Sequence, residues 1–229
     1  MKQYCLISIM LFAVLTANSQ VTDTSVITRK NDILLIHLLN NTWLNNNSKV
    51  ETMPVSIGVD VYAMKNILKK DKPFNLSIGI GVSVQNVHNN SLPYDSLQII
   101  YFKPIPGGYQ YTKNKFCESY IDVPIEINYL SRPDKRMRNF KLTVGGRFGY
   151  MISNFIKYTG EDFRNTTNEI VKFKEFRIDN VMKYRYGIYL RLIYGKIGLV
   201  ANYSFTPLFE KNKGPDFTPF TYGFSFSIM

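Results

Sequence analysis

Few residues of this sequence have the chemistry of a general base, a nucleophile or a metal ligand. The chain contains two histidines, His37 and His88, and two cysteines, Cys5 and Cys117. The histidines and cysteines have no metal-site spacing. The paired glycine of IPGGYQY is not followed by a helix, so it indicates a turn and not a phosphate-binding loop. The sequence therefore predicts no enzyme, no metal site and no cofactor.

Charged side chains of both signs form a second group, whose chemistry would be mutual pairing. They share one parity within segments of alternating polarity, as Asp122 and Glu126 do in YIDVPIEINYL. Charges on an enclosed face need partners, so we predict ion pairs that link these two carboxylates to Arg147, Arg185 or Arg191. The whole predicted network consists of Asp60, Asp122, Glu126, Lys141, Arg147, Lys183, Arg185 and Arg191.

Seven segments position these charges, and each alternates large apolar residues with small or polar ones. Such alternation predicts a β-strand with one apolar and one polar face. The closing segment FTYGFSFSIM is a clear example, with Tyr222, Phe224, Phe226 and Ile228 on one face. The seven segments are 54–64, 74–85, 120–130, 140–153, 182–195, 197–207 and 220–229.

An eighth strand is expected at 32–44, DILLIHLLNNTWL, although this segment alternates poorly. A short helix is the alternative there, because residues 33–39 are almost entirely apolar. Single-chain barrels of the bacterial outer membrane have even strand numbers. That regularity favours the strand.

Two environments would suit these strands: a soluble sandwich, or a barrel with its apolar face in lipid. Strand length favours the barrel, because a tilted membrane strand needs about ten residues. Short gaps after the second, fourth and sixth strands, with long gaps at 88–118 and 154–181, favour it too. The expected fold is therefore all-β: an eight-stranded antiparallel up-and-down transmembrane β-barrel with short periplasmic turns and two long extracellular loops.

The polar face is expected to line the barrel interior, because a charge facing lipid near the midplane would cost a few kcal/mol. An eight-stranded barrel is only wide enough for side chains to fill. This favours a structural plug over a pore. Six glycines share the inward parity and are expected to make room for long Arg and Tyr side chains; they are at positions 79, 81, 145, 149, 187 and 198.

The first residues, MKQYCLISIMLFAVLTANSQ, are typical of a secretory signal peptide. We therefore expect a signal peptide at 1–19 and an outer-membrane barrel domain at 20–229. Cleavage would leave Cys117 as the only cysteine, and 27 basic against 17 acidic residues, a net charge of +10. This balance suggests phosphate-bearing partners. Export argues against nucleic acid and favours lipopolysaccharide.

The first long gap combines aromatic with basic residues, which suits contact with a partner protein or with lipopolysaccharide phosphates. An interfacial aromatic girdle with a solvated rim is the alternative. In the second long gap, VKFKEF around Phe173 is expected to extend the barrel wall outside the membrane. The candidate contacts in the first gap are Tyr94, Tyr101, Phe102, Lys103, Tyr109, Tyr111, Lys113 and Lys115.

Several motifs occur in a specific order: Trp43-Leu44, FNLSIGIGVSVQNV, YIDVPIE, RPDK, KYRYGIYLRLIYG and SFTPLFEKNKGPDFTP. With them the chain resembles the PorT-like outer-membrane β-barrel proteins of Bacteroidetes, over nearly the whole expected mature chain. The resemblance implies an outer-membrane location and about eight strands. It also implies an acidic inward residue in the first strand, where this chain has His37 instead.

These observations predict a non-enzymatic integral outer-membrane protein with a structural or interaction role. Through the resemblance, this role is expected to be accessory to a type IX secretion or envelope complex. The expected partners are outer-membrane lipid, lipopolysaccharide and proteins of such a complex. A lipid A-modifying enzyme, which would use a histidine with a serine or carboxylate, is the first alternative. A small-solute channel, disfavoured by the filled interior, is the second.

Overall fold

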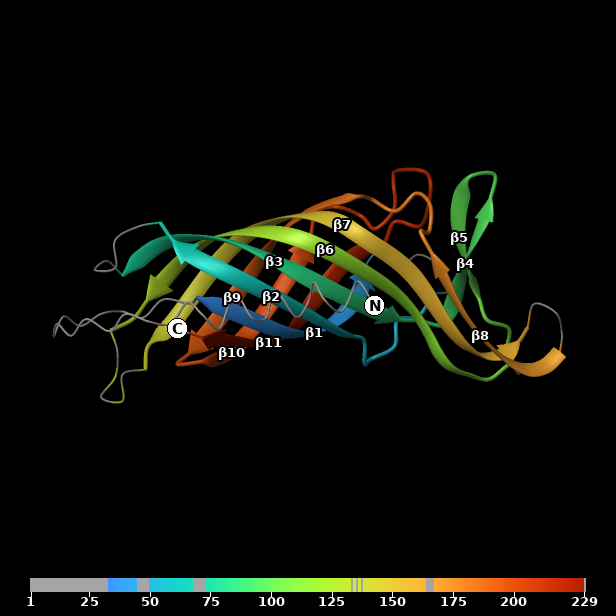
Figure 1. The fold of residues 1–229 in the computed structure, drawn as a ribbon, viewed down its shortest axis with the longest axis horizontal. Coiled ribbons are helices and arrows are strands. Elements are labelled where there is room, and N and C mark those ends of the chain that lie inside the picture. Colours follow the sequence, from blue (N-terminus) through green and yellow to red (C-terminus); the bar gives the residue numbers. More distant parts are fainter. Residues whose placement is uncertain are drawn as a thin grey trace, which may run out of the picture.

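The protein is all-β over the residues that the computed structural model describes, and its strands pair antiparallel (Figure 1). These residues are 33–44, 50–67, 73–132, 134, 136, 138–163 and 167–228. Within these ranges no helix is long and apolar enough to cross a membrane. The predicted signal peptide at 1–19 lies outside the described residues.

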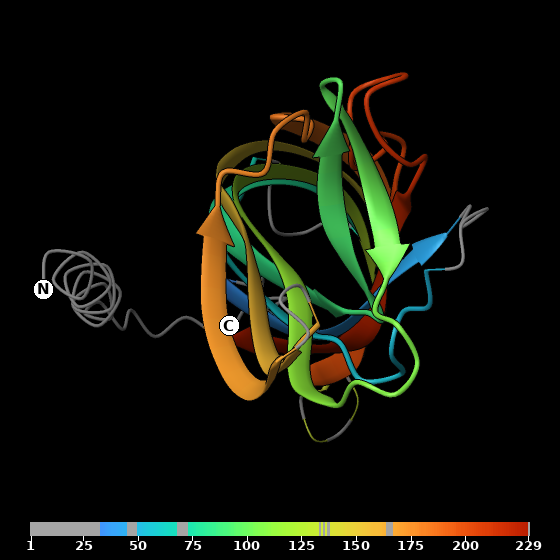
Figure 2. The same cartoon turned by 90° about the vertical axis from the view of Figure 1, so that its right-hand side faces the viewer.

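Eight strands close into a ring, in which each strand pairs with the ring strands before and after it in the chain (Figure 2). The first and last strands complete the ring, from Leu34 opposite Ile228 to Leu44 opposite Thr218. The predicted all-β, antiparallel arrangement of eight strands is confirmed. The ring strands are β1 (Leu34–Leu44), β2 (Ile57–Asn66), β3 (Phe74–His88), β6 (Tyr111–Leu130), β7 (Phe140–Asp162), β9 (Tyr184–Tyr194), β10 (Ile197–Ser204) and β11 (Thr218–Ile228).

Strand β1 confirms the strand expected at 32–44 and rules out the helix. Its pairing with β2 places His37 opposite Asp60, and its pairing with β11 places His37 opposite Ser225. His37 is buried together with Leu35 and Leu39, which share its parity. Neighbouring strands thus fix a register that the apolar sequence of β1 does not specify by itself.

The two long gaps contain strands, so the prediction that they are loops is wrong in large part. β6 begins inside the first gap, and β7 continues into the second. The first gap also holds a separate hairpin of β4 (Ser91–Ser96) and β5 (Ile99–Pro104), and the second holds β8 (Thr167–Phe176) paired with β7. Beyond the ring, β6, β7 and β8 form a three-stranded extension, visible at the right of Figure 1. The predicted extension of the wall around Phe173 is confirmed.

A β-bulge explains why the continuation of β7 does not follow its earlier period-two pattern. Ser119 of β6 pairs with Ser153 of β7, but the next residue, Tyr120, pairs with Met151, so β7 holds one extra residue. Beyond this point the buried positions of β7 change from odd to even numbers, as at Ile156 and Tyr158. A one-residue insertion in one strand of a pair has this effect on the faces.

An aromatic cluster lies at the ring end from which the extension rises. Trp43 stacks on Phe217 with 4.6 Å between ring centroids, and it meets Phe102 and Phe116 edge to face. The connections at this end therefore have a hydrophobic core of their own. This cluster, the aromatic cap, comprises the buried residues Trp43, Val50, Val87, Leu92, Ile100, Phe102, Phe116, Ile156, Tyr158, Ile178, Val181, Leu208, Phe209 and Phe217.

In the ring, apolar side chains face outward and polar side chains face inward, the reverse of the arrangement in a soluble protein. In β9 the residues at even positions are exposed tyrosines and aliphatics, whereas Arg185 and Arg191 are buried. In the last strand Tyr222, Phe224 and Ile228 are exposed, while Ser225 and Ser227 are buried. The predicted assignment of the polar face to the interior and of the apolar face to the outside is confirmed.

Candidate functional site

The best-defined group in the ring interior is a carboxylate–guanidinium pair between β6 and β9. Asp122 Oδ2 lies 2.5 Å from Arg185 Nη2, and Asp122 Oδ1 accepts a hydrogen bond from Arg185 Nε at 3.1 Å. Ser83 donates to the same carboxylate and accepts from Arg185 Nη2 at 2.7 Å. The ring of Tyr120 lies 3.7 Å from the guanidinium carbon. Paired contacts and additional donors of this kind are what a buried ion pair requires.

The hydroxyl of Tyr62 connects this pair to a second carboxylate. It lies 3.2 Å from an oxygen of Asp122 and 3.2 Å from an oxygen of Asp60. Asp60 Oδ2 lies 3.7 Å from Arg147 Nη1 and 3.8 Å from His37 Nδ1. Both distances exceed the hydrogen-bond range, so these groups interact with Asp60 through charge, and His37 contributes only when protonated.

A third group occupies the interior between β6 and β9, four residues further along β6. Glu126 Oε2 accepts a hydrogen bond from Arg191 Nη2 at 2.9 Å, and Glu126 Oε1 accepts one from the Tyr189 hydroxyl at 2.7 Å. Thr143 lies 3.4 Å from Arg191 and donates to Asn128 Oδ1 at 2.6 Å. The Arg185–Asp122 and Arg191–Glu126 pairs are among those that the sequence predicted.

Seven of the eight predicted network residues are buried; the exception is Lys183, for which the prediction is wrong. Lys183 is exposed and precedes β9, which begins at Tyr184, so strand parity does not determine where it points. Lys141 is buried on β7. Arg147 lies 3.7 Å from Asp60, a carboxylate to which the prediction did not link it.

Glu118 is a buried carboxylate that the sequence pattern did not indicate, because it falls in the gap at 88–118, which was expected to be a loop. β6 begins at Tyr111, and Glu118 is buried in it, accepting a hydrogen bond from the Tyr120 hydroxyl at 2.7 Å. Its even parity with Asp122 was the signal that could have found it. Among the described residues inside the closed ring, four buried carboxylates then match four buried cations: Asp60, Glu118, Asp122 and Glu126 against Lys141, Arg147, Arg185 and Arg191, while the buried Asp162 lies on the extension.

Two inward glycines are required by the close approach of these side chains. A Cβ at Gly149 would collide with Asp122 and Arg185, and a Cβ at Gly145 would collide with the Tyr189 ring. These contacts confirm that glycines on the inward face make room for long side chains.

The interior leaves little room for a substrate near the charges. A cavity of about 10 Å³, lined by Gln85, Glu118, Arg147 and Arg185 among others, has space for about one water molecule. Cys117 is buried, with its Sγ 2.9 Å from Asn86 Oδ1. Among the described residues, no group of three or more His, Cys, Asp or Glu side chains is arranged to hold a metal ion.

The predicted loop contacts separate into buried and accessible residues. Phe102 is buried in the aromatic cap, so its predicted role as a partner contact is wrong. On the hairpin, Tyr94, Tyr101 and Lys103 are exposed. The remaining four lie just before β6 or within its first five residues: Tyr109, Tyr111 and Lys115 are half-buried, and Lys113 is exposed.

Outside the ring, one carboxylate organises the turn between β6 and β7. Asp134 Oδ1 accepts hydrogen bonds from the backbone N–H groups of Arg138 at 2.8 Å and Arg136 at 2.9 Å. Its Oδ2 accepts from the Tyr194 hydroxyl at 2.9 Å. The backbone N–H of Arg138, with the Tyr194 hydroxyl and the backbone N–H of Arg136, lowers the pKa of the Asp134 carboxyl to about 2. The turn is thus held by the ionised form.

We expect the Asp134 turn to loosen only in strong acid. Because the pKa of Asp134 is lowered from 3.8 in the unfolded chain to about 2 when folded, its stabilisation is complete above the unfolded value. It decreases below pH 3.8 and is lost as the pH falls through about 2. Carboxyl ¹³C NMR of the folded protein should give a midpoint near 2, and Tyr194→Phe should raise it. A midpoint at the ordinary value in the wild type would contradict this arrangement.

Comparison with protein-family models, with curated proteins and with solved structures found no match. The described residues therefore define the class by architecture: an all-β protein with a closed ring of eight antiparallel strands, a charged interior and an apolar outer face. The resemblance to PorT-like proteins stays a prediction.

Proposed function

We propose that the protein is an integral outer-membrane β-barrel with a filled interior and a structural or interaction role without catalysis. The observation that carries this proposal is the outer face of the ring. In the described ring strands, charges at outward positions occur only at Lys65 near the end of β2, at Lys115 where β6 enters the ring, and on the extension beyond the ring. Exposed apolar surface on this scale is unusual for a soluble monomer, whose patches seldom exceed a few hundred Å².

Aromatic residues at both ends of the apolar face further support insertion. At one end Tyr150 pairs with Tyr184, and at the other Phe140 pairs with Tyr194. On β9 the outward residues between Tyr186 and Tyr194 are aliphatic. The 11 residues from Tyr184 to Tyr194, on a strand tilted by ~40° with a rise of ~3.3 Å per residue, span about 25 Å along the barrel axis. That height matches the apolar band of outer-membrane barrels, which aromatic girdles flank.

Insertion is testable with the whole mature chain. Refolded into phospholipid vesicles, the protein should float with them, resist added protease over the ring strands, and migrate faster on gels when unheated than when boiled. A protein that stays soluble without detergent and is digested in the ring strands would refute the proposal.

We expect the inserted protein not to act as a channel. The Asp122–Arg185 and Glu126–Arg191 pairs occupy the interior, and the aromatic cap lies at one end. Planar-bilayer recordings of the purified protein should therefore show no stable large conductance. A control barrel of known conductance in the same lipid would prove that the assay works. Stable large conductance from this protein would contradict a filled interior.

An accessory role in a type IX secretion or envelope complex is proposed from the resemblance to PorT-like proteins. Affinity purification of the tagged protein from detergent-solubilised outer membranes, followed by mass spectrometry, tests it. Secretion-system subunits recovered at near-equal amounts would support the role. Recovery of the barrel alone would contradict it and favour a free-standing surface protein.

A further inference from the structure

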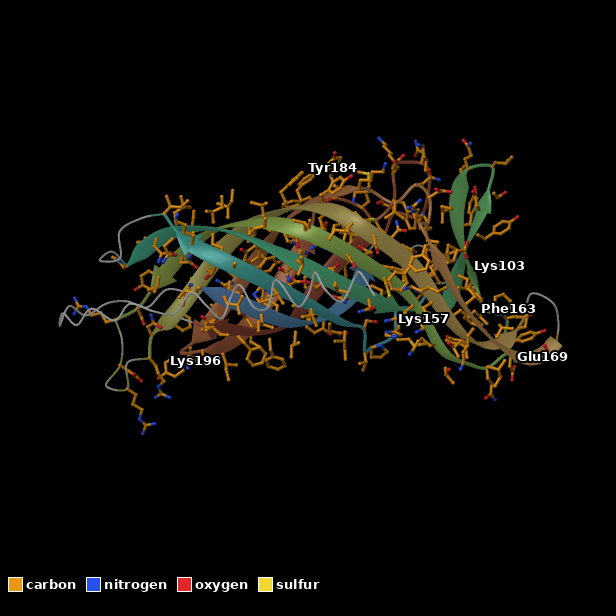
Figure 3. The ribbon with its side chains drawn as sticks, viewed as in Figure 1. Lys103, Lys157, Phe163, Glu169, Tyr184 and Lys196 are labelled. Carbon is orange, nitrogen blue, oxygen red and sulfur yellow. The ribbon has the colours of Figure 1, made fainter. Side chains whose placement is uncertain are left out.

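Lysines lie in cross-strand register where the three-stranded extension meets the ring, since Lys115 also pairs with His88 of β3. Lys115 of β6 pairs with Lys157 of β7, and Lys157 pairs with Lys174 of β8. These three residues are called the lysine row. In the adjacent register positions, Lys113 and Lys172 flank Thr159 on either side. Figure 3 labels Lys157 on the extension, at the opposite end of the molecule from Lys196.

The lysine row faces outward, away from the aromatic cap. On β7, Ile156 and Tyr158 on either side of Lys157 are buried in the cap, whereas Lys157 is exposed. On β8, Phe173 packs against the cap, whereas Lys174 is exposed. Lys157 and Lys174 therefore lie on the outer face, and Lys115, which is half-buried, shares this face because it pairs directly with Lys157.

No salt bridge involves the lysine row in the described part of the chain; Lys115 Nζ donates to Asn86 Oδ1 at 2.7 Å. The Lys174 ammonium lies 3.7 Å from the ring centre of Phe155 and 4.2 Å from that of Phe176. Like charges directly opposite on neighbouring strands destabilise a sheet. An anion bound across the row would remove this repulsion.

The position of the row identifies which anion fits. Lys157 follows Phe155 by two residues, about 7 Å along the strand, and Ile152 and Tyr150 of the apolar outer face precede it on β7. A ligand at this place meets apolar surface on one side and cationic groups on the other. A phosphorylated lipid of the outer leaflet has this polarity, because its acyl chains lie below its phosphates. Lysines beside an apolar surface extend their ammonium groups to such a boundary.

We propose that the lysine row binds the phosphate groups of an outer-leaflet lipid, of which lipopolysaccharide is the class. This inference rests on the proposed membrane insertion. Lys113 and Lys172 add positive charge beside the same site. The site differs from the candidate contacts of the hairpin, because it lies on the wall, where Lys103 takes no part.

The test uses the full mature protein in phosphatidylcholine nanodiscs that contain lipid A, with native mass spectrometry to count bound lipid A. Each interfacial lysine contributes ~1 kcal/mol to attraction by anionic lipid. We therefore expect K115S/K157S/K174S to bind lipid A on the order of 100-fold more weakly than the wild type. The control variant K196S/K211S/K213S removes the same charge from exposed lysines outside the row and should bind as the wild type does.

The possible outcomes distinguish loss of the binding site from loss of folding. Equal binding by K115S/K157S/K174S and the wild type, or equal loss in the control variant, would overturn the site. Equal binding of lipid A from which the phosphates have been removed would overturn phosphate recognition. If free heparin bound through the same three lysines as tightly as lipid A, the row would bind anions in general, and the assignment to a membrane lipid would be overturned. Gel mobility of the unheated protein reports insertion independently, so failure of insertion is distinguished from failure of the site.

Discussion

Arg185→Met is expected to lower the free energy of unfolding by about 3–5 kcal/mol, because it leaves the Asp122 carboxylate buried without its cation. Asp122 and Arg185 are both buried, and the guanidinium donates to the carboxylate at two positions. Equilibrium unfolding in urea from detergent micelles, followed by the fluorescence of the single tryptophan, Trp43, measures the loss.

A double variant and a surface variant make this prediction specific. D122N/R185M should recover at least half of the loss, since no unpaired charge then remains in the interior. Arg138→Met removes the same side chain from the exposed pair with Asp134 and should cost less than about 1 kcal/mol. If Arg185→Met cost no more than Arg138→Met, the ion pair would not be a structural element of the interior.

Ile125→Arg is expected to cost about 2–4 kcal/mol on folding into a bilayer, because it places a charge on the outer face near the membrane midplane. Ile125 is 51% exposed and is the middle outward residue of the apolar run from Ile121 to Tyr129 on β6. Folding yield and urea midpoint in phospholipid vesicles are the measurements. On a water-exposed sheet the same change would be close to neutral.

Ile170→Arg is the matched control, since it replaces an isoleucine that is 73% exposed on β8, beyond the ring. It should leave folding into vesicles unchanged. Equal effects of the two arginines would contradict a lipid-facing position of Ile125.

The sequence predicted the ring because period-two alternation depends only on which side of a strand each residue faces. Wherever a strand stays regular, as from Tyr184 to Tyr194, the pattern also predicts which residues are enclosed. For this reason the pattern alone predicts interior positions for Asp60, Asp122, Glu126, Arg185 and Arg191. Their partners depend on the register between strands distant in sequence, such as β6 and β9.

The predictions that are wrong concern positions where strand parity is interrupted or where long-range packing decides burial. The bulge between Tyr150 and Ser153 shifts parity, so the continuation of β7 has no regular pattern across it. Lys183 has the right parity but precedes the first residue of its strand. Phe102 is aromatic and lies near lysines, yet the cap that buries it is assembled from segments as distant as Trp43 and Phe217. Long-range packing of this kind leaves no local signal.

The proposal depends above all on whether the apolar outer face contacts lipid. A single tryptophan placed on it, Ile125→Trp in a Trp43→Phe background, reports this directly after reconstitution into phosphatidylcholine brominated at the middle of its acyl chains. We expect strong quenching of that tryptophan by the bromolipid and little quenching by aqueous acrylamide, with the reverse for Ile170→Trp in the same background. Quenching of the tryptophan at position 125 by acrylamide and not by bromolipid would show that the ring faces water and would contradict the account.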